Sequence, residues 1–401
     1  MNLDLLFVII FYGLILFFFF KKREKFQVQG KIFALYRTKL GIRLMDKIAK
    51  FTPRLLHFLA YLSILAGFVG MLFIFYFLIR GTLQLIFVPQ AIPAVAPVLP
   101  GIKVLPGLPV LSFWHWIISI FIVAVVHEFS HGVFARLHNI NIKSSGFAFL
   151  GPILAAFVEP DEKELAKKTK KAQLAVFSAG PFSNIIMALI FIVIMNFIAM
   201  PIYNSVYEAN GIKVGKTIED YPAHEQNIQA PFIIKSINNL KTLDFNDFIN
   251  STKNLKPGDT IYLETDKGNY TLIASSNPEN KSKAFIGITN FDPEIKLRNN
   301  IKEKYGEKLP KVYSWIHMLI FWLIIVNLGV GLFNLLPLGP IDGGRMFFTA
   351  LLAIFKNAEK AKKIWSLISL FCLLLIFINL VPYLWKLLLF IIKPFILFFG
   401  I

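Results

Sequence analysis

Cysteine and charged residues are both scarce in this sequence. One cysteine, Cys372, occurs in 401 residues, which excludes an intrachain disulfide and a site built from several cysteines. Charged residues make up only 16% of the chain, against about 25% in an ordinary soluble domain. Hydrophobic residues reach 56%, which excludes a disordered chain and exceeds what a soluble globule of this length can bury. The composition therefore predicts a membrane protein.

Acidic residues are few compared with basic ones. Lys and Arg total 42 and Asp and Glu total 24, which gives a formal net charge of +18 at pH 7. We predict no nucleic-acid partner, because the basic residues do not form a soluble basic domain. In membrane proteins an excess of Lys and Arg marks cytoplasmic loops. Residues 21–56 hold eleven Lys and Arg and two acids, so this segment is expected in the cytoplasm.

Long apolar runs recur along the chain and predict about six transmembrane helices. The first run, Leu5–Phe20, has its basic residues after it and no small-residue cleavage site, so a retained anchor is expected rather than a signal peptide. The later apolar runs cover residues 57–79, 111–137, 172–202, 312–336, 346–355, 364–380 and 383–401. Pro382 separates the last two, which predicts either two spans or one span and one interfacial helix.

Two segments differ from these runs. Residues 145–158 are apolar but too short to span, and their Gly and Pro predict a membrane-associated β-hairpin rather than a helix. Residues 203–311 are polar, with fifteen Lys and Arg and fourteen Asp and Glu, and contain short strand patterns between turns. This stretch predicts a small soluble α+β domain, which lies on the outer side if the spans alternate.

The sequence thus predicts a polytopic α-helical membrane protein of the cell membrane with one inserted domain. Four regions are expected. They are N-terminal transmembrane helices and loops (1–110), a core with the hairpin (111–202), the soluble domain (203–311) and a C-terminal transmembrane region (312–401).

The strongest chemical signal is the motif His127-Glu128-x-x-His131. Residues four apart on a helix share a face, so both imidazoles can bind one metal ion. Zinc lowers the pKa of a water bound to it towards about 7, and an adjacent Glu can take the proton of that water. Ionisable groups inside a membrane span are costly and mark function by default. The alternative is a polar helix face with satisfied histidines inside a helix bundle.

A catalytic zinc site needs a third protein ligand. Asp342 is the leading candidate, because it lies in the Pro- and Gly-rich stretch 334–345 between two apolar runs. A plain turn between spans remains the alternative for this residue. The histidines near span ends are expected to have interfacial or packing roles. They are His57, His115, His138 and His317.

Four stretches in order resemble the site-2 protease family of intramembrane zinc metalloproteases. HEFSH at 127–131 is similar to the family's zinc motif, and NLLPLGPIDGGR at 334–345 is similar to its second motif. FSAGPFSN at 177–184 is similar to a third signature, which opens the following span. SGFAFLGPILAAFVEPDEKEL at 145–165 resembles the family's membrane-associated hairpin in its archaeal and bacterial form.

The resemblance implies a role for each matching residue. His127, His131 and Asp342 would bind one Zn²⁺ per chain, and Glu128 would be the catalytic general base. Asn334 would hold the substrate strand or help to polarise its carbonyl.

Further matching positions belong to substrate binding. Asn184 matches a family Asn that would bind substrate, with a hydrogen bond between helices as an equal alternative. The hairpin offers a sheet edge for an unwound substrate strand, and Gly146, Phe147 and Gly151 are its candidate contact residues.

The soluble insert resembles a PDZ domain of the circularly permuted kind found in bacterial proteases. Residues 222–223, 233–239, 245–250 and 254–260 carry the similarity. Gly211-Ile212-Lys213-Val214 is the candidate peptide-binding loop and strand, although the usual glycine-rich signature is missing. The domain would bind a peptide or a substrate C-terminus, or it would only gate access for large ectodomains.

The resemblance therefore implies hydrolysis of peptide bonds within or near transmembrane segments of membrane proteins, with the active site near the cytoplasmic side. Such cleavage serves regulated intramembrane proteolysis or removal of membrane remnants. Two other classes stay open, a membrane metal-ion transporter and a non-catalytic scaffold with PDZ-like partner binding. The sequence shows no paired halves of the transporter kind. A scaffold has no need of Glu128 beside two ligands.

Overall fold

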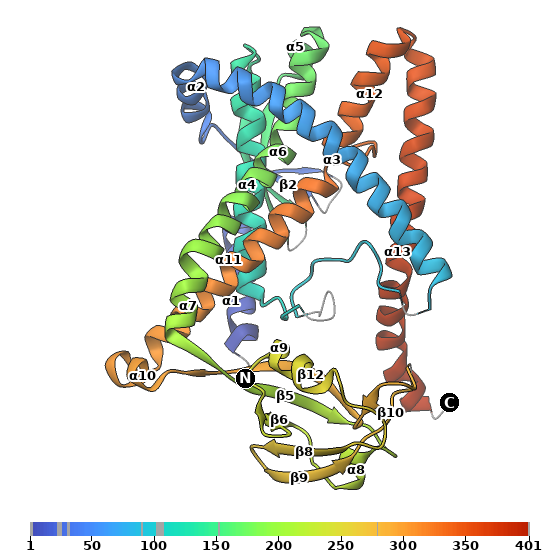
Figure 1. Cartoon of the computed structure of the whole chain (residues 1–401). Helices are drawn as coiled ribbons and strands as arrows, with labels where there is room; N and C mark the ends of the chain where they lie inside the picture. Colours follow the sequence, from blue (N-terminus) through green and yellow to red (C-terminus); the bar gives the residue numbers. More distant parts are fainter. Residues whose placement is uncertain are drawn as a thin grey trace. The chain divides into compact units, whose positions relative to one another are not determined.

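A computed structural model (Figure 1) describes residues 3–21, 26–29, 33–89, 91–101, 108–150, 153–278 and 280–399. The chain divides into two compact units. The first, here called the membrane unit, comprises Met1–Ile194 and Met318–Ile401. The second, here called the insert unit, comprises Met195–His317 and contains the polar stretch 203–311.

Long apolar helices dominate the membrane unit. Within the described residues, five helical stretches have the length and hydropathy to cross a membrane. They are Pro53–Phe87 (α3), Phe113–Leu137 (α4), Lys170–Val206, Lys308–Phe333 (α11) and Ala358–Leu389. Lys170–Val206 joins α6 (Lys170–Ile194), the π-helical turn η2 (Met195–Ala199) and α7 (Met200–Val206). The N-terminal apolar run forms α1 (Leu3–Lys21). The number of actual crossings stays a prediction.

The C-terminal helices differ from the expectation. The two runs on either side of Pro382 belong to one helix, α13 (Ala358–Phe399), with 42 residues. A proline removes one backbone donor, but an apolar helix can continue past it when neighbouring turns and helices satisfy the freed group. The run 346–355 belongs to α12 (Asp342–Phe355), whose 14 residues are too few to cross a bilayer.

A four-stranded antiparallel sheet in the membrane unit contains the expected hairpin. Its order is β1 (Phe26–Gln29), β2 (Phe33–Thr38), β3 (Ile142–Leu150) and β4 (Ile153–Pro160). The strands β1 and β2 come from the basic segment that was expected to be a loop. The Arg37 side chain ties β2 to the hairpin, because it donates hydrogen bonds to Ser144 and Glu159. In this order β1 and β4 are the edge strands of the described sheet.

Close helix packing positions the rest of this unit. The helix α6 packs against α3, α4 and α12. The hydroxyls of Ser63 on α3 and Ser178 on α6 lie 2.9 Å apart. Small residues let backbones approach inside a membrane, where polar side chains also join helices. Two short helices complete the unit, α2 (Ile42–Phe51) and α5 (Glu162–Lys167).

The insert unit is a small antiparallel sheet with short helices. Its main sheet runs in the order β12-β5-β6-β8-β9, and β7 pairs with β6. The strands are β5 (Tyr207–Thr217), β6 (Phe232–Ile237), β7 (Leu240–Lys241), β8 (Thr260–Thr265), β9 (Gly268–Ile273) and β12 (Ile288–Leu297). The remaining elements are α8 (Pro222–Glu225), α9 (Phe245–Thr252), β10 (Ser275–Ser276), β11 (Ala284–Phe285) and α10 (Asn299–Tyr305).

The strand that we expected to bind peptide lies inside this sheet. Residues 211–214 belong to β5, which pairs with β12 on one side and with β6 on the other. Its backbone groups are therefore already used, and a peptide cannot add to it. Among the described strands, β12 is the edge next to β5, so the expectation for residues 211–214 is wrong and the candidate edge is β12.

Candidate metal centre

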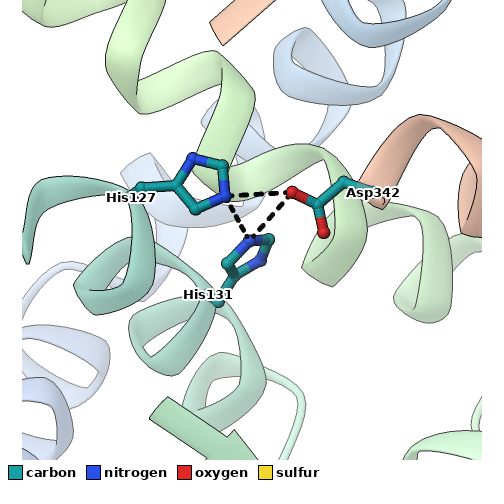
Figure 2. A group of neighbouring side chains, drawn as sticks. All are labelled: His127, His131 and Asp342. Carbon is teal, nitrogen blue, oxygen red and sulfur yellow. Dashed lines mark hydrogen bonds and ion pairs between the residues drawn. The ribbon is translucent and has the colours of Figure 1, made fainter. Parts of the chain in front are cut away.

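The two motif histidines lie one turn apart on α4. Both side chains are buried, and their Nε2 atoms are 3.2 Å apart. The rings meet at an interplanar angle of 75°, so their edges converge rather than stack. Figure 2 shows both Nε2 atoms directed at one point beside the helix.

The third group at this point is Asp342, the first residue of α12. Its Oδ2 atom lies 3.0 Å from Nε2 of His127 and 3.2 Å from Nε2 of His131 (Figure 2). The two glycines after Asp342 allow the tight approach, because a Cβ on Gly343 or Gly344 would collide with backbone atoms of residues 335–339. The N–H of Gly343 also donates to the carbonyl of Asn334 at 2.7 Å. The loop is therefore folded back on itself, which fixes the carboxylate.

This donor set fits zinc. Ligand atoms about 2.0–2.1 Å from a tetrahedral zinc lie about 3.3 Å from one another, close to the three separations found here. Two imidazoles and one carboxylate leave a fourth position open, as in catalytic zinc sites. A Cβ built on Gly180 of α6 would collide with Nε2 of both histidines, so the absence of a side chain there keeps the centre open.

The other ring nitrogens of both histidines face α6. Nδ1 of His131 lies 2.7 Å from the carbonyl oxygen of Val176, to which it can donate. Nδ1 of His127 lies 3.0 Å from Nδ2 of Asn184. Asn184 is fully buried, which favours the alternative of a hydrogen bond between helices over a contact with substrate. The contact with His127 joins α6 to α4.

Glu128 lies beside the centre and is held by the sheet. Its Oε2 atom accepts a hydrogen bond from the backbone N–H of Val158 at 3.0 Å. Val158 belongs to β4, the edge strand, and the N–H that reaches Glu128 points away from β3. No sequence pattern indicates such a backbone contact, so it was not among our predictions.

A cavity of about 690 Å³ brings these groups together. Glu128, Asn334 and the three metal-ligand candidates line it. Charged residues also line it, namely Lys143, Glu159, Glu162, Lys163 and Arg345. Arg345 on α12 lies 3.6 Å from Glu162 on α5, so oppositely charged groups from two elements meet at the cavity. These charged residues were not among the site residues expected from the sequence.

The proposed hairpin contacts need a correction. Gly146 and Phe147 lie on β3, where they pair with β2 on one side and with β4 on the other. Their backbone groups therefore offer no free edge to a substrate strand. The free edge in the described sheet is β4, whose Phe157 and Val158 line the cavity. Gly151 lies outside the described residues.

The remaining candidate histidines have other contacts. His57 and His138 contact each other with ring centroids 5.7 Å apart, and His317 stacks on Tyr203 at 4.5 Å. Burial, with a smaller contribution from His57, lowers the pKa of His138 to about 4, so this ring is neutral at pH 7. Nδ1 of His115 lies 2.5 Å from the hydroxyl of Ser112, the N-cap residue of α4. These contacts fit packing and helix-end roles.

The sequence of this chain is similar to those of several known proteins. An uncharacterized protein of Methanocaldococcus jannaschii is 29% identical over 352 residues, which cover 85% of this chain and 84% of that protein. A Fusobacterium nucleatum protein named "putative zinc metalloprotease" is 22% identical over 320 residues, which cover 65% of this chain and 90% of that protein.

Among solved structures, the PDZ domain of an SdrC-like protein from Listeria monocytogenes matches 23% of this chain and 92% of its own, with 20% identity and a TM-score of 0.18. The sequence model of peptidase family M50 matches residues 115–376, a range that contains the metal-ligand candidates, Glu128 and Asn334. The resemblance to the site-2 proteases is thereby confirmed, and this chain belongs to peptidase family M50.

Proposed function

We propose that this protein is an intramembrane zinc metalloprotease that hydrolyses peptide bonds within or near transmembrane segments of other membrane proteins. The observation that carries the proposal is the convergence of His127, His131 and Asp342, with Glu128 opening on the same cavity. Two of the ligands lie on α4, a helix long and apolar enough to span a membrane. Ionisable groups on such a helix cost free energy inside the membrane, so their presence there indicates a functional role.

When bound, zinc supplies a Lewis acid for the scissile carbonyl and for the attacking water. Glu128 acts as the general base, which takes the proton from that water and passes it to the leaving amine. Its hydrogen bond from Val158 keeps the carboxylate at the cavity and beside the edge of β4. The two histidines and Asp342 need only hold their positions, because their geometry is already set by α4 and the Gly-rich loop.

A substrate helix must unwind before it is cut, because its carbonyls are engaged in its own hydrogen bonds. We propose that the unwound segment pairs with the free edge of β4. Strand addition supplies hydrogen bonds to the backbone groups of the unwound substrate, which have no water to bind inside the membrane. A segment on this edge would pass Phe157 and Val158, which line the cavity with Glu128.

Asn334 would support the same step, because it lines the same cavity. It lies in the loop before Asp342, and its own carbonyl is fixed by the N–H of Gly343. Its side chain lines the cavity. An amide there can hold the substrate backbone or donate to the scissile carbonyl, and we propose this role.

We also propose that the centre faces the cytoplasm. Residues 163–171 and 356–363 (KNAEKAKK) are basic. The first segment contains Lys163, which lines the cavity, and the second follows α12, whose Asp342 and Arg345 line it. Cleavage would then release a cytoplasmic fragment, and we propose that the insert 203–311 lies on the outer side, as alternation of the spans would require.

For the insert unit, we propose binding of an extended peptide at the edge of β12. An apolar pocket of about 210 Å³ lies between α9 and this strand, lined by Phe248, Phe285, Ile288 and Phe291 among others. A peptide that pairs with β12 would place an apolar side chain in this pocket. Its source would be the C-terminus or an exposed segment of a substrate.

The test uses the purified full chain in proteoliposomes with a co-reconstituted transmembrane substrate. We expect one zinc per chain, and cleavage that stops when a chelator removes the metal and returns when zinc is restored. Mass spectrometry of the products should place the cut within or near the transmembrane segment. A His127→Ala protein, prepared identically, is the negative control.

Two outcomes would contradict the proposal. One is zinc binding without cleavage of any transmembrane substrate, accompanied by zinc flux across the vesicle membrane, which would favour a transporter. The other is cleavage that persists after complete removal of metal.

A further inference from the structure

We propose that Asn184 is a positioning residue for the metal centre. In this role its side-chain amide accepts the Nδ1–H of His127 and thereby fixes the tautomer that presents Nε2 to the metal. The inference rests on the proposed zinc site and assigns a residue outside the three ligands and the base.

The first observation is an unsatisfied atom. Asn184 lies on α6 and is fully buried. Its Nδ2 faces Nδ1 of His127 at 3.0 Å, and its Oδ1 is buried without a hydrogen-bond partner among the described residues. A half-turn of the amide exchanges the two atoms and places Oδ1 against the ring nitrogen. One hydrogen bond then satisfies both the amide oxygen and the ring.

The second observation is the chemistry of the ring. A neutral imidazole carries one N–H, so a histidine that binds metal through Nε2 must carry its proton on Nδ1. Ligating histidines almost always donate that second N–H to an acceptor, which fixes both tautomer and orientation. Nε2 of His127 faces Asp342 and His131, so its Nδ1 is the nitrogen that needs the acceptor.

The third observation is the shared face of α6. Val176, Gly180 and Asn184 follow one another at intervals of four residues, so they lie on one face of this helix. The carbonyl of Val176 can accept a hydrogen bond from Nδ1 of His131. Gly180 has no side chain, which leaves room for the Nε2 atoms of both histidines. The side-chain amide of Asn184 faces Nδ1 of His127. Each of the two motif histidines thus faces its own acceptor on α6, one from the backbone and one from a side chain.

A purely structural role is the competing explanation, because a buried amide can also join two helices. The two roles differ in what replaces the amide. A helix-joining contact would be harmed by any change, whereas a positioning contact needs only an acceptor of the right size. Aspartate at position 184 keeps an acceptor oxygen, while leucine and alanine remove it.

The experiment compares three variants of the full-length protein in detergent, Asn184→Asp, Asn184→Leu and Asn184→Ala. The zinc dissociation constant is measured by competition with a chelator of known affinity, and thermal stability is measured without metal. We expect the leucine and alanine variants to bind zinc about 10–100-fold more weakly, the usual cost of losing such a partner. The aspartate variant should stay within about threefold of the wild type.

Asn327→Leu is the matched control. Asn327 is also a fully buried amide on an apolar helix, α11, but within the described part of the chain its Nδ2 donates to the carbonyl of Leu323 in its own helix. This variant should bind zinc as the wild type does. It separates the loss of any buried amide from the loss of the contact with His127.

Several results would overturn the inference. Asn184→Leu or Asn184→Ala protein that binds zinc as tightly as the wild type would do so, as would an aspartate variant as weak as the leucine variant. If the leucine variant does not fold, the alanine and aspartate pair decides the question. Failure of the wild type to bind zinc would overturn the proposed function and this inference together, whereas wild-type binding with unaffected variants would overturn this inference alone.

Discussion

The two units of this protein each contain an antiparallel sheet whose edge strand borders a cavity, but the two cavities differ in chemistry. In the membrane unit, β4 borders a space of about 690 Å³ that contains the metal-ligand candidates, Glu128 and several charged residues. In the insert unit, β12 borders a pocket of about 210 Å³ lined almost wholly by apolar side chains. The membrane unit, which is rich in apolar residues, thus contains the polar cavity, and the more polar insert unit contains the apolar pocket.

The difference teaches where to look for function in a chain that crosses a membrane. Apolar residues are the background of the membrane unit, so its converging polar groups need an explanation, and catalysis provides one. In the insert unit an apolar pocket adjoins an edge strand, and recognition of an extended peptide is the role that we propose for it. We therefore expect changes in the first unit to affect chemistry and changes in the second to affect recognition.

The largest effect is expected when a metal ligand is removed. Asp342→Ala should weaken zinc binding by more than about 100-fold, the upper end of the cost of losing an outer partner. Cleavage should fall to background, while the insert unit keeps its fold. Zinc content by elemental analysis and substrate cleavage in proteoliposomes measure the two effects. Glu162→Gln, a change on the same cavity, is the control and should keep its zinc; equal zinc loss in both would show that the cavity, not the ligand, was damaged.

A smaller effect is expected from added bulk at the centre. Gly180→Ala should destabilise the membrane unit by about 1–3 kcal/mol and weaken zinc binding, because the new methyl group would occupy the space of the ligating nitrogens. Gly329→Ala on α11 is the matched control, since a Cβ there meets nothing within 4 Å. Thermal unfolding and chelator competition on both proteins provide the measurement. Identical behaviour of the two variants would show that α6 does not approach the histidines so closely.

An intermediate loss of activity is expected from the edge of β4. Val158→Pro removes the N–H that holds Glu128 but keeps the ladder to β3, because this N–H points away from that strand. We expect kcat/KM to fall about tenfold or more, as for loss of a hydrogen bond to a charged group. Val158→Ala keeps the N–H and should retain activity with the same zinc content. Wild-type kinetics in the proline variant would exclude this role for the strand.

The smallest effect on cleavage is expected from the insert unit. Phe291→Ala removes a ring that packs on Phe248 with centroids 5.3 Å apart, and should lower the free energy of unfolding of this unit by about 1–3 kcal/mol. Peptide binding, followed by fluorescence anisotropy with the full chain, should be lost, and zinc content should not change. Ile295→Ala, at an exposed position of the same strand, is the control. Loss of zinc in the Phe291→Ala variant would contradict the separate roles that we assign to the two units.

Much of the site could be predicted from the sequence because its groups contrast with their surroundings. His127, Glu128, His131 and Asp342 are ionisable residues in or between apolar runs, and such residues stand out without a structure. The hairpin could be predicted for a similar reason, because 145–158 is too short to span and contains Gly and Pro.

Other features depend on pairings that a linear pattern does not contain. Residues 26–29 and 33–38 form the strands β1 and β2, and β2 pairs with β3 of the distant hairpin. Because β2 occupies one side of β3, the free edge of the hairpin is β4. Asn184 could be singled out from the sequence motif, but its role depends on its contact with His127, which only the structure shows. Pro382 suggested a helix end, yet the chain continues through it because a membrane helix tolerates one missing donor.

The central claim is that Glu128 performs peptide hydrolysis beside a metal held by His127, His131 and Asp342. The most direct test is the cleavage rate of a transmembrane substrate by zinc-loaded Glu128→Gln protein, compared with the wild type in the same vesicles. The account predicts unchanged zinc content and a rate lower by about 10²–10⁴-fold, the usual contribution of a general base. Cleavage at the wild-type rate by the zinc-loaded variant would contradict it.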